Sequence, residues 1–177
     1  MNVERLVPSH ASEYRALMLE AYAAHPEAFT SSFSERLALP LSWWEARLAA
    51  DETPKEMVLG AFEGSVLAGI AGLSFDQREK VRHKATLFGM YVSAKSRRRG
   101  MGRALVVAAL EYARSQVGVR IVQLTVTHGN LAALRLYESC GFVQFGLEPF
   151  AVAVGDGYVS KVHMWRNVEA SDSEKRT

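Results

Sequence analysis

The sequence predicts a mixed α/β (α+β) fold in which helices flank one central sheet. Lys84–Val92 has the apolar, β-branched and aromatic composition of a buried strand, and Arg120–Thr127 is rich in apolar and β-branched residues. Between them, Gly100–Gln116 holds apolar residues at helical spacing and contains no proline. A strand, a crossover helix and a second strand of one sheet form a right-handed connection. The two strands are therefore predicted to be a parallel pair.

The rest of the sheet is predicted to be antiparallel. Met57–Phe62 and Val66–Phe75 are strand-like and are separated by little more than Glu63-Gly64, which predicts a hairpin. Three further strands are expected: an edge strand at Asn2–Val7, a short strand at Phe142–Gly146 and a last strand at Tyr158–Trp165.

Three more helices are expected beside the crossover helix. Ala11–Ala24 has apolar residues at helical spacing, and His25-Pro26 should end it. Pro40 is a plausible start for a helix over Ser42–Ala50. Asn130–Ser139 begins with a good N-cap residue, Asn130. Glu27–Ser34 is rich in serine and is expected to be irregular.

Length and composition indicate one globular domain. The 177 residues, 49% of them hydrophobic, can bury a substantial core, so a single domain is expected over residues 1–168, with a flexible polar tail at 169–177. The net charge of +2 does not suggest a general polyanion binder. One cysteine, Cys140, excludes an intramolecular disulfide and a cysteine metal cluster, and no metal is expected. Without an apolar run of membrane-spanning length or a signal-peptide core, a cytoplasmic protein with no membrane contact is expected.

The loop Ser96–Arg103, between the central strand and its helix, has the features of an anion site. The free N–H groups of a first helical turn point toward an anion, and the helix dipole favours negative charge there. Gly100 and Gly102 let a phosphate approach the backbone. Four arginines add charge-assisted donors: Arg97, Arg98, Arg99 and Arg103. The alternative is an ordinary surface turn with solvated arginines.

Nucleotide-binding fingerprints do not fit this loop, which has neither G-x-G-x-x-G nor G-x-x-x-x-G-K-[ST]. The pattern [QR]-x-x-G-x-[GA] does fit, with Arg97 first, Gly100 fourth and Gly102 sixth. This pattern resembles the acyl-CoA pyrophosphate loop of the GNAT family of N-acetyltransferases.

A second motif follows about thirty residues later. The segment from Asn130 to Phe142 has the pattern N-x-x-A-x-x-L-Y-x-x-x-G-F after a buried strand. Local physics explains it simply: Asn130 caps the helix, Tyr137 packs and Gly141 ends the helix. The spacing and order also resemble the second cofactor motif of the GNAT family, and the two motifs together identify the chain as a member.

The resemblance implies a GNAT-like sheet whose parallel pair splays apart at a bulge, with acetyl-CoA bound there as a co-substrate. Gly89 is a natural bulge residue. Cofactor contacts are implied for the backbone of Met90, Tyr91 and Val92, for Arg97, Arg98, Arg99, Gly100, Met101, Gly102 and Arg103 of the loop, and for Asn130 and Tyr137.

Tyr137 also matches the family's general acid, which protonates the departing CoA thiolate. A phenol is protonated at neutral pH and acidic enough to share its proton with a developing thiolate. The resemblance implies direct attack of the substrate amine on the thioester, so Cys140 is not needed as a nucleophile and is expected to pack at a helix end.

The sequence leaves open which group acts as the general base. Ribosomal-protein alanine acetyltransferases of the family resemble the second motif and carry a glutamate base on the preceding strand, where this chain has Thr125. A threonine cannot serve as that base. The other candidates, besides a water chain, are Glu27, Glu35, His83, His128, Glu148 and His163.

The resemblance implies a primary amine as acceptor, with a small-molecule amine favoured and a protein N-terminus also open. Residues 20–56 hold seven acidic side chains against three basic ones. Beside Phe29, Phe33, Trp43 and Trp44, they form a possible acidic wall for a cationic amine. The alternative is a solvated helix face over core aromatics.

Three function classes are compared: an acetyl-CoA-dependent N-acetyltransferase, a non-catalytic acyl-CoA-binding regulatory protein on the same fold, and a nucleic-acid-binding module using the arginine cluster. The first is expected. The third lacks a recognisable groove-reading or RNA-stacking motif, so no nucleic acid is expected as a partner. Formation of a homodimer is left open.

Overall fold

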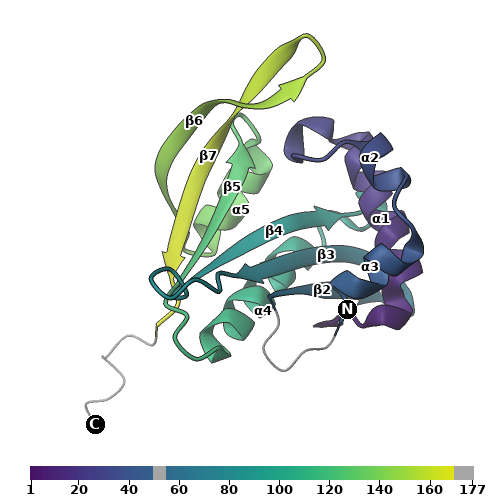
Figure 1. The fold of residues 1–177 in the computed structure, drawn as a ribbon, viewed down its shortest axis with the longest axis horizontal. Coiled ribbons are helices and arrows are strands. Elements are labelled where there is room, and N and C mark those ends of the chain that lie inside the picture. Colours follow the sequence, from purple (N-terminus) through teal and green to yellow (C-terminus); the bar gives the residue numbers. More distant parts are fainter. Residues whose placement is uncertain (50–54, 170–177) are drawn as a thin grey trace.

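A computed structural model describes residues 1–49 and 55–169. It contains a seven-stranded sheet in the order β1-β2-β3-β4-β5-β7-β6, with helices on both faces (Figure 1). The strands are β1 (Asn2–Arg5), β2 (Glu56–Glu63), β3 (Val66–Phe75), β4 (Lys84–Val92), β5 (Ile121–Thr127), β6 (Val143–Val154) and β7 (Gly157–Asn167). The α-helices are α1 (Ala11–Ala24), α2 (Phe33–Leu37), α3 (Leu41–Arg47), α4 (Met101–Ser115) and α5 (Leu131–Ser139).

The predicted mixed sheet is confirmed. β4 and β5 are parallel and are joined through α4, whereas the other neighbouring strands are antiparallel. The parallel pairing is short, because only Lys84–Thr86 has register partners, in Ile121–Gln123. Beyond these residues the two strands diverge (Figure 1). The backbone of β4 after Thr86 therefore has no β5 neighbour to pair with.

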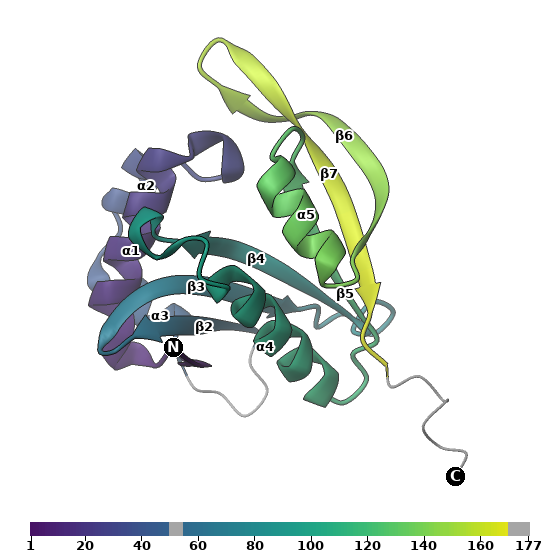
Figure 2. The same cartoon turned by 180° about the vertical axis from the view of Figure 1, so that it is seen from behind.

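Alternation along the central strands builds a core on each face of the sheet. α4 and α5 cover the face seen in Figure 2, and Leu105 and Val106 of α4 are fully buried there. On the other face, Trp44 of α3 and Tyr14 of α1 pack in a second core that includes Ile70 of β3. The first core continues across β4 and β5 to α5 and β7, whereas the second is confined to the half of the sheet that α1 and α3 cover. A site can therefore form beside the diverging strands.

The last hairpin is longer than the sequence predicted. β6 continues to Val154, whereas a short strand ending at Gly146 was expected. Pro149 follows Glu148 and cannot donate a ladder hydrogen bond, which favours an early end. The structure absorbs it in a bulge between Glu148 and Val152, where Phe150 has φ of 54°. Most side chains of this edge strand are exposed, so it has no alternating pattern to detect.

A short helix, α2, begins at the end of the segment expected to be irregular, Glu27–Ser34. In α2, Ser32 accepts a hydrogen bond from the Glu35 N–H, and the Glu35 carboxylate accepts one from the Ser32 N–H at 2.7 Å. This S-x-x-E capping box is visible in the sequence. α3 ends at Arg47, before the expected Ala50, and Ala50 itself lies outside the described residues, as do residues 170–177 of the expected tail.

Candidate active site

The expected bulge lies at Gly89. Ile70 of β3 pairs with Tyr91, but Gly72 pairs with Phe88, so β4 contains one more residue than β3 between these pairs. Gly89 has φ of +59°, a conformation that glycine adopts without strain. The bulge is confirmed, and it begins the stretch of β4 that faces the gap between the parallel strands.

The N-terminus of α4 presents free N–H groups beside this stretch. Gly100 caps the helix with φ of 77°, and the first intrahelical bond runs from the Ala104 N–H to the Gly100 carbonyl at 3.0 Å. The N–H groups of Met101, Gly102 and Arg103 therefore have no partner within the helix. Together with the positive end of the helix dipole, they can bind an anion.

The four arginines of the loop are placed differently. Arg97 is held by the Val92 carbonyl, which accepts from its Nε at 3.0 Å, and by His25 at 2.9 Å. Arg99 lies 3.2 Å from a Glu63 carboxylate oxygen. Arg97, Arg98 and Arg103 line the loop's cavity, whereas Arg99 does not.

A cavity of about 610 Å³, here called the loop cavity, opens between the splayed β4, this loop and α5. Ligand pockets of small molecules and cofactors have volumes in this range. Apart from Arg99, every residue predicted to bind the cofactor lines it: Met90, Tyr91, Val92, Arg97, Arg98, Gly100, Met101, Gly102, Arg103, Asn130 and Tyr137.

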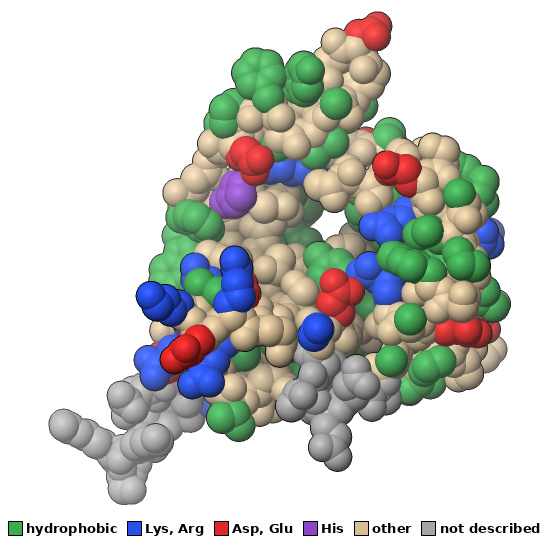
Figure 3. All heavy atoms as spheres, viewed as in Figure 1, with side chains coloured by type: hydrophobic (Ala, Val, Ile, Leu, Met, Phe, Trp, Pro, Cys, Tyr) green, Lys and Arg blue, Asp and Glu red, His purple; other side chains and the backbone are tan. Residues whose placement is uncertain are grey.

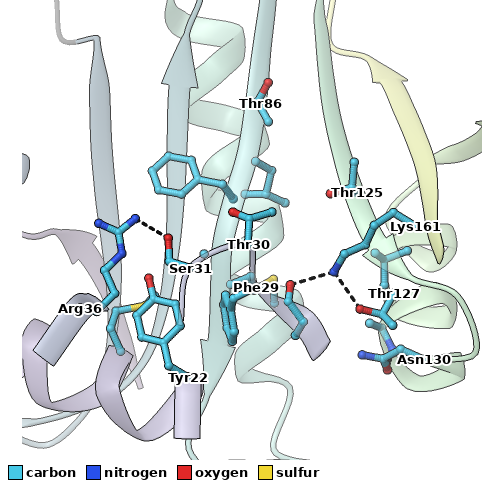
Figure 4. Close-up of a pocket in the computed structure, with 18 of the residues that line it drawn as sticks. Tyr22, Phe29, Thr30, Ser31, Arg36, Thr86, Thr125, Thr127, Asn130 and Lys161 are labelled. Atoms are coloured by element: carbon cyan, nitrogen blue, oxygen red, sulfur yellow. Dashed lines mark hydrogen bonds between the residues drawn. The ribbon is translucent and has the colours of Figure 1, made fainter. Parts of the chain in front are cut away.

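A second cavity of about 260 Å³, here called the helix cavity, lies between α1–α3 on one side and β5 and β7 on the other (Figure 4). The surface is hollowed between these two parts of the molecule (Figure 3). The two cavities share Ala28, Phe29, Met90, Asn130, Ala133 and Tyr137. They therefore meet in the gap between β4 and α5.

Tyr137 is located at this junction. Its side chain is buried, and its hydroxyl donates to the Met90 sulfur at 3.4 Å. Burial raises the pKa of the Tyr137 phenol above its ordinary value, with a smaller contribution from Cys140. The phenol therefore keeps its proton at neutral pH, as a proton donor must.

Asn130 has both of the roles considered from the sequence. Its side-chain oxygen accepts from the Ala133 N–H at 3.1 Å and caps α5. The same residue lines both cavities. The helix cap thus fixes a polar side chain beside Tyr137.

The charges of the helix cavity contradict the acidic wall expected from the sequence. Its charged lining residues in the described part of the chain are Arg36, Arg47 and Lys161. The nearby carboxylates are used elsewhere: Glu20 accepts from the Tyr91 hydroxyl at 2.8 Å, and Glu56 pairs with Arg47 at 2.9 Å. Of the expected aromatic residues, Trp44 lies in the core and only Phe29 lines the cavity.

Lys161 holds the two sides of the gap together. Its ammonium donates to the carbonyl of Glu27 at 3.1 Å and to that of Ala28 at 2.9 Å. It also donates to the Thr127 hydroxyl at 2.8 Å (Figure 4). Burial lowers the pKa of Lys161, and the carboxylates of Glu27 and Glu148 oppose this shift. The segment after α1 is thereby fixed to β5 and β7.

None of the six side chains considered as a general base lines either cavity. Thr125 does line the helix cavity, and its register partner on β7 is His163. His163 Nε2 lies 2.7 Å from a Glu148 carboxylate oxygen. Register partners on antiparallel strands project to one face with Cβ atoms about 4.5–5.5 Å apart. His163 is therefore the candidate nearest along the sheet to Thr125.

Sequence reasoning missed Arg36 and Lys161 as residues of the site. For Arg36, the signal was the capping box of Ser32 and Glu35, which marks the start of the helix that contains Arg36. For Lys161, the signal was a lysine inside a predicted strand that also contains Val159, Val162 and Met164. A buried lysine in a strand needs partners, which indicates a polar site.

Within residues 1–49 and 55–169, no helix has both the length and the apolar character needed to cross a membrane.

The chain is similar to several known acetyltransferases. A mycothiol acetyltransferase of Renibacterium salmoninarum is 28% identical over 136 residues, which cover 73% of this chain and 36% of that protein. The human N-acetyltransferase 8 is 33% identical over 90 residues, 51% of this chain and 39% of that protein. The chain thus spans well under half the length of these two relatives. The N-alpha-acetyltransferase RimI of Mycobacterium tuberculosis is 33% identical over 112 residues, covering 62% of this chain and 67% of that protein.

Among solved structures, a GNAT-family acetyltransferase from Streptococcus pneumoniae aligns with a TM-score of 0.82 and 27% identity. The alignment covers 94% of this chain and 98% of that one. The sequence profile of the Acetyltransferase (GNAT) family matches residues 16–142. Because this match covers more than half of the chain, the protein belongs to the GNAT acetyltransferase family.

Proposed function

We propose that the protein is an N-acetyltransferase that moves an acetyl group from acetyl-CoA to a primary amine by direct attack. The observation that carries this proposal is the position of Tyr137, a buried proton donor where the loop cavity meets the helix cavity. A thioester that enters from one cavity and an amine that enters from the other would meet beside its hydroxyl.

Acetyl-CoA would occupy the loop cavity, with its pyrophosphate at the free N–H groups of Met101, Gly102 and Arg103. The side chains of Arg97, Arg98 and Arg103 would add positive charge. Arg99, paired with Glu63, would contribute only its backbone. The unpaired edge of β4 at Met90, Tyr91 and Val92 would bind the pantetheine arm as a further strand would.

In the reaction, the amine nitrogen attacks the thioester carbonyl carbon and forms the new C–N bond. The C–S bond then breaks, Tyr137 gives its proton to the sulfur, and the amine loses a proton to a base. No covalent enzyme intermediate is required. Cys140 is buried at the C-cap of α5, where it packs in the core, and has no role in this scheme.

We assign the proton acceptor to His163, acting through water and oriented by Glu148. A His163→Gln variant is expected to lower kcat/KM by about 10²-fold and to abolish the rise of kcat/KM with pH that reports the base. His128→Gln is the matched control, since His128 is exposed and lines neither cavity. An unchanged pH profile in the His163 variant would refute the assignment.

A non-catalytic acyl-CoA-binding protein is the second candidate, favoured by Thr125 at the position of the relatives' glutamate. The enzyme and the non-catalytic binding protein are distinguished by measuring the free CoA released from acetyl-CoA in the presence of polyamines, amino acids, aminoglycosides and N-terminal peptides. Release that depends on an amine supports the enzyme. CoA binding without amine-dependent release supports the regulatory protein.

The protein is proposed to act in the cytoplasm and to bind acetyl-CoA and the amine substrate. A homodimer is the proposed assembly, because β6 exposes a row of apolar side chains at a sheet edge: Val143, Phe145 and Leu147.

A further inference from the structure

The helix cavity carries positive charge on two sides. Arg36 of α2 and Lys161 of β7 lie on opposite sides of it (Figure 4). Arg47 of α3 also lines it. The described residues that line the cavity include no aspartate or glutamate. A small cavity of this kind attracts a negatively charged group and repels a polycation.

The two arginines differ in their partners. Arg47 has a carboxylate partner in Glu56, at 2.9 Å. The guanidinium of Arg36 donates to the Ser31 hydroxyl at 2.7 Å, and no carboxylate oxygen of the described residues lies within 4.0 Å of it. Among the described residues, the Arg36 guanidinium therefore has no carboxylate counter-ion.

The surroundings of Arg36 hold its guanidinium in place. Its carbon lies 4.6 Å from the centroid of the Trp43 ring, close enough for a cation–π contact. The hydroxyls of Tyr22, Thr30 and Ser31 lie on the same side of the cavity (Figure 4). A planar guanidinium that is fixed by stacking is suited to bidentate binding of a carboxylate, and neighbouring hydroxyls can donate to the same group.

We propose that the acceptor is a small amino carboxylate, whose carboxylate binds Arg36 and whose amine reaches Tyr137. This inference rests on the proposed acetyltransferase function and names its substrate class. A cavity of about 260 Å³ lined by both residues has room for a short amino acid. Met18, Phe29 and Phe88 supply apolar walls for its carbon chain.

The test compares amines that differ only in the carboxylate. L-methionine is measured against L-methioninamide, and 4-aminobutyrate against 4-aminobutyramide, by free CoA release with acetyl-CoA. Spermidine and an amidated Ala-Ala-Ala peptide serve as the polycation and the protein N-terminus. At least one acid is expected to have a kcat/KM at least about tenfold above its amide and above both other amines.

Arg36→Gln removes the charge and the fork but keeps a polar side chain. It is expected to lower kcat/KM for the preferred acid at least about tenfold, while kcat/KM for the corresponding amide changes less than about threefold. For Arg36→Lys, which keeps the charge but not the fork, kcat/KM for the acid should lie between the values of the wild type and Arg36→Gln. Arg114→Gln is the charge-matched control, because Arg114 is exposed on α4 and lines neither cavity.

An Arg36→Gln variant whose kcat/KM falls equally for the acid and its amide would overturn the inference. A wild-type enzyme that prefers spermidine or the peptide would also overturn it. If no amine releases CoA, the proposed function fails, and calorimetry with the CoA-bound protein then decides this inference separately. Binding of L-methionine or 4-aminobutyrate that is lost in Arg36→Gln would support it, and absence of binding to the wild type would overturn it.

Discussion

Replacing Tyr137 with phenylalanine is expected to lower kcat by about 10- to 10⁴-fold, the range for one general acid, with CoA affinity nearly unchanged. The hydroxyl acts only as the C–S bond breaks, so its loss should raise the energy of the transition state more than that of the bound complex. Steady-state kinetics at saturating acetyl-CoA, alongside calorimetric CoA binding, measures both quantities.

Tyr112→Phe is the matched control, because Tyr112 is on α4, packs against Phe75 and lines neither cavity. It should have wild-type kinetics. If Tyr137 only packs, its variant would be less stable or bind CoA more weakly, with kcat little changed. A Tyr137→Phe enzyme with wild-type kcat would show that another group protonates the thiolate.

The pH dependence of this variant follows from burial. An unperturbed phenol ionises near pH ~10, and the wild type would then lose its proton donor there. Burial raises the pKa of Tyr137, so the phenol stays protonated through that pH. The ratio of wild-type to variant kcat is therefore expected to remain constant up to about pH 10 and to narrow only above it. Narrowing at lower pH would contradict the raised pKa.

Replacing Gly102 with valine is expected to raise the CoA dissociation constant at least about tenfold. A Cβ atom on Gly102 would lie 3.2 Å from Leu136 and 3.3 Å from Met90, both of which line the loop cavity. The additional methyl groups of valine would fill the space between α4 and β4 where the pyrophosphate is proposed to bind. Isothermal titration calorimetry with CoA measures the change.

Gly157→Val is its control, since Gly157 lies at the start of β7 and a Cβ there meets nothing closer than 4.0 Å. Thermal unfolding establishes that both variants are folded. Unchanged CoA affinity in a folded Gly102→Val protein would mean that the cofactor does not pass this helix turn.

The central fold was predictable because its signals are local. The strand–loop–helix–strand order determined the parallel pair, and Gly89 marked the bulge that precedes the splayed stretch of β4. The same locality made Gly100, Asn130 and Tyr137 visible in short motifs. Gly100 and Asn130 cap helices, and Tyr137 lies on one of them, so residues nearby in the sequence determine each position.

The helix cavity was not predictable in this way. Its lining comes from α1, α2, α3, β4, β5, α5 and β7, which only tertiary packing brings together. Counting charges over residues 20–56 suggested an acidic wall, but Glu35 caps a helix and Glu56 pairs with Arg47. The two arginines of that acidic stretch, with Lys161 from the far end of the chain, line the cavity instead.

Direct transfer of the acetyl group at Tyr137 is the central step of the proposed reaction. Its most direct test is a stoichiometric one, in which free CoA, the acetylated amine and the intact protein mass are measured in one reaction with acetyl-CoA and the best acceptor of the amine panel. Direct transfer predicts one acetylated amine for each CoA released and a protein whose mass does not change. CoA released without acetylated amine, or an acetylated protein that forms and decays at the rate of turnover, would contradict it.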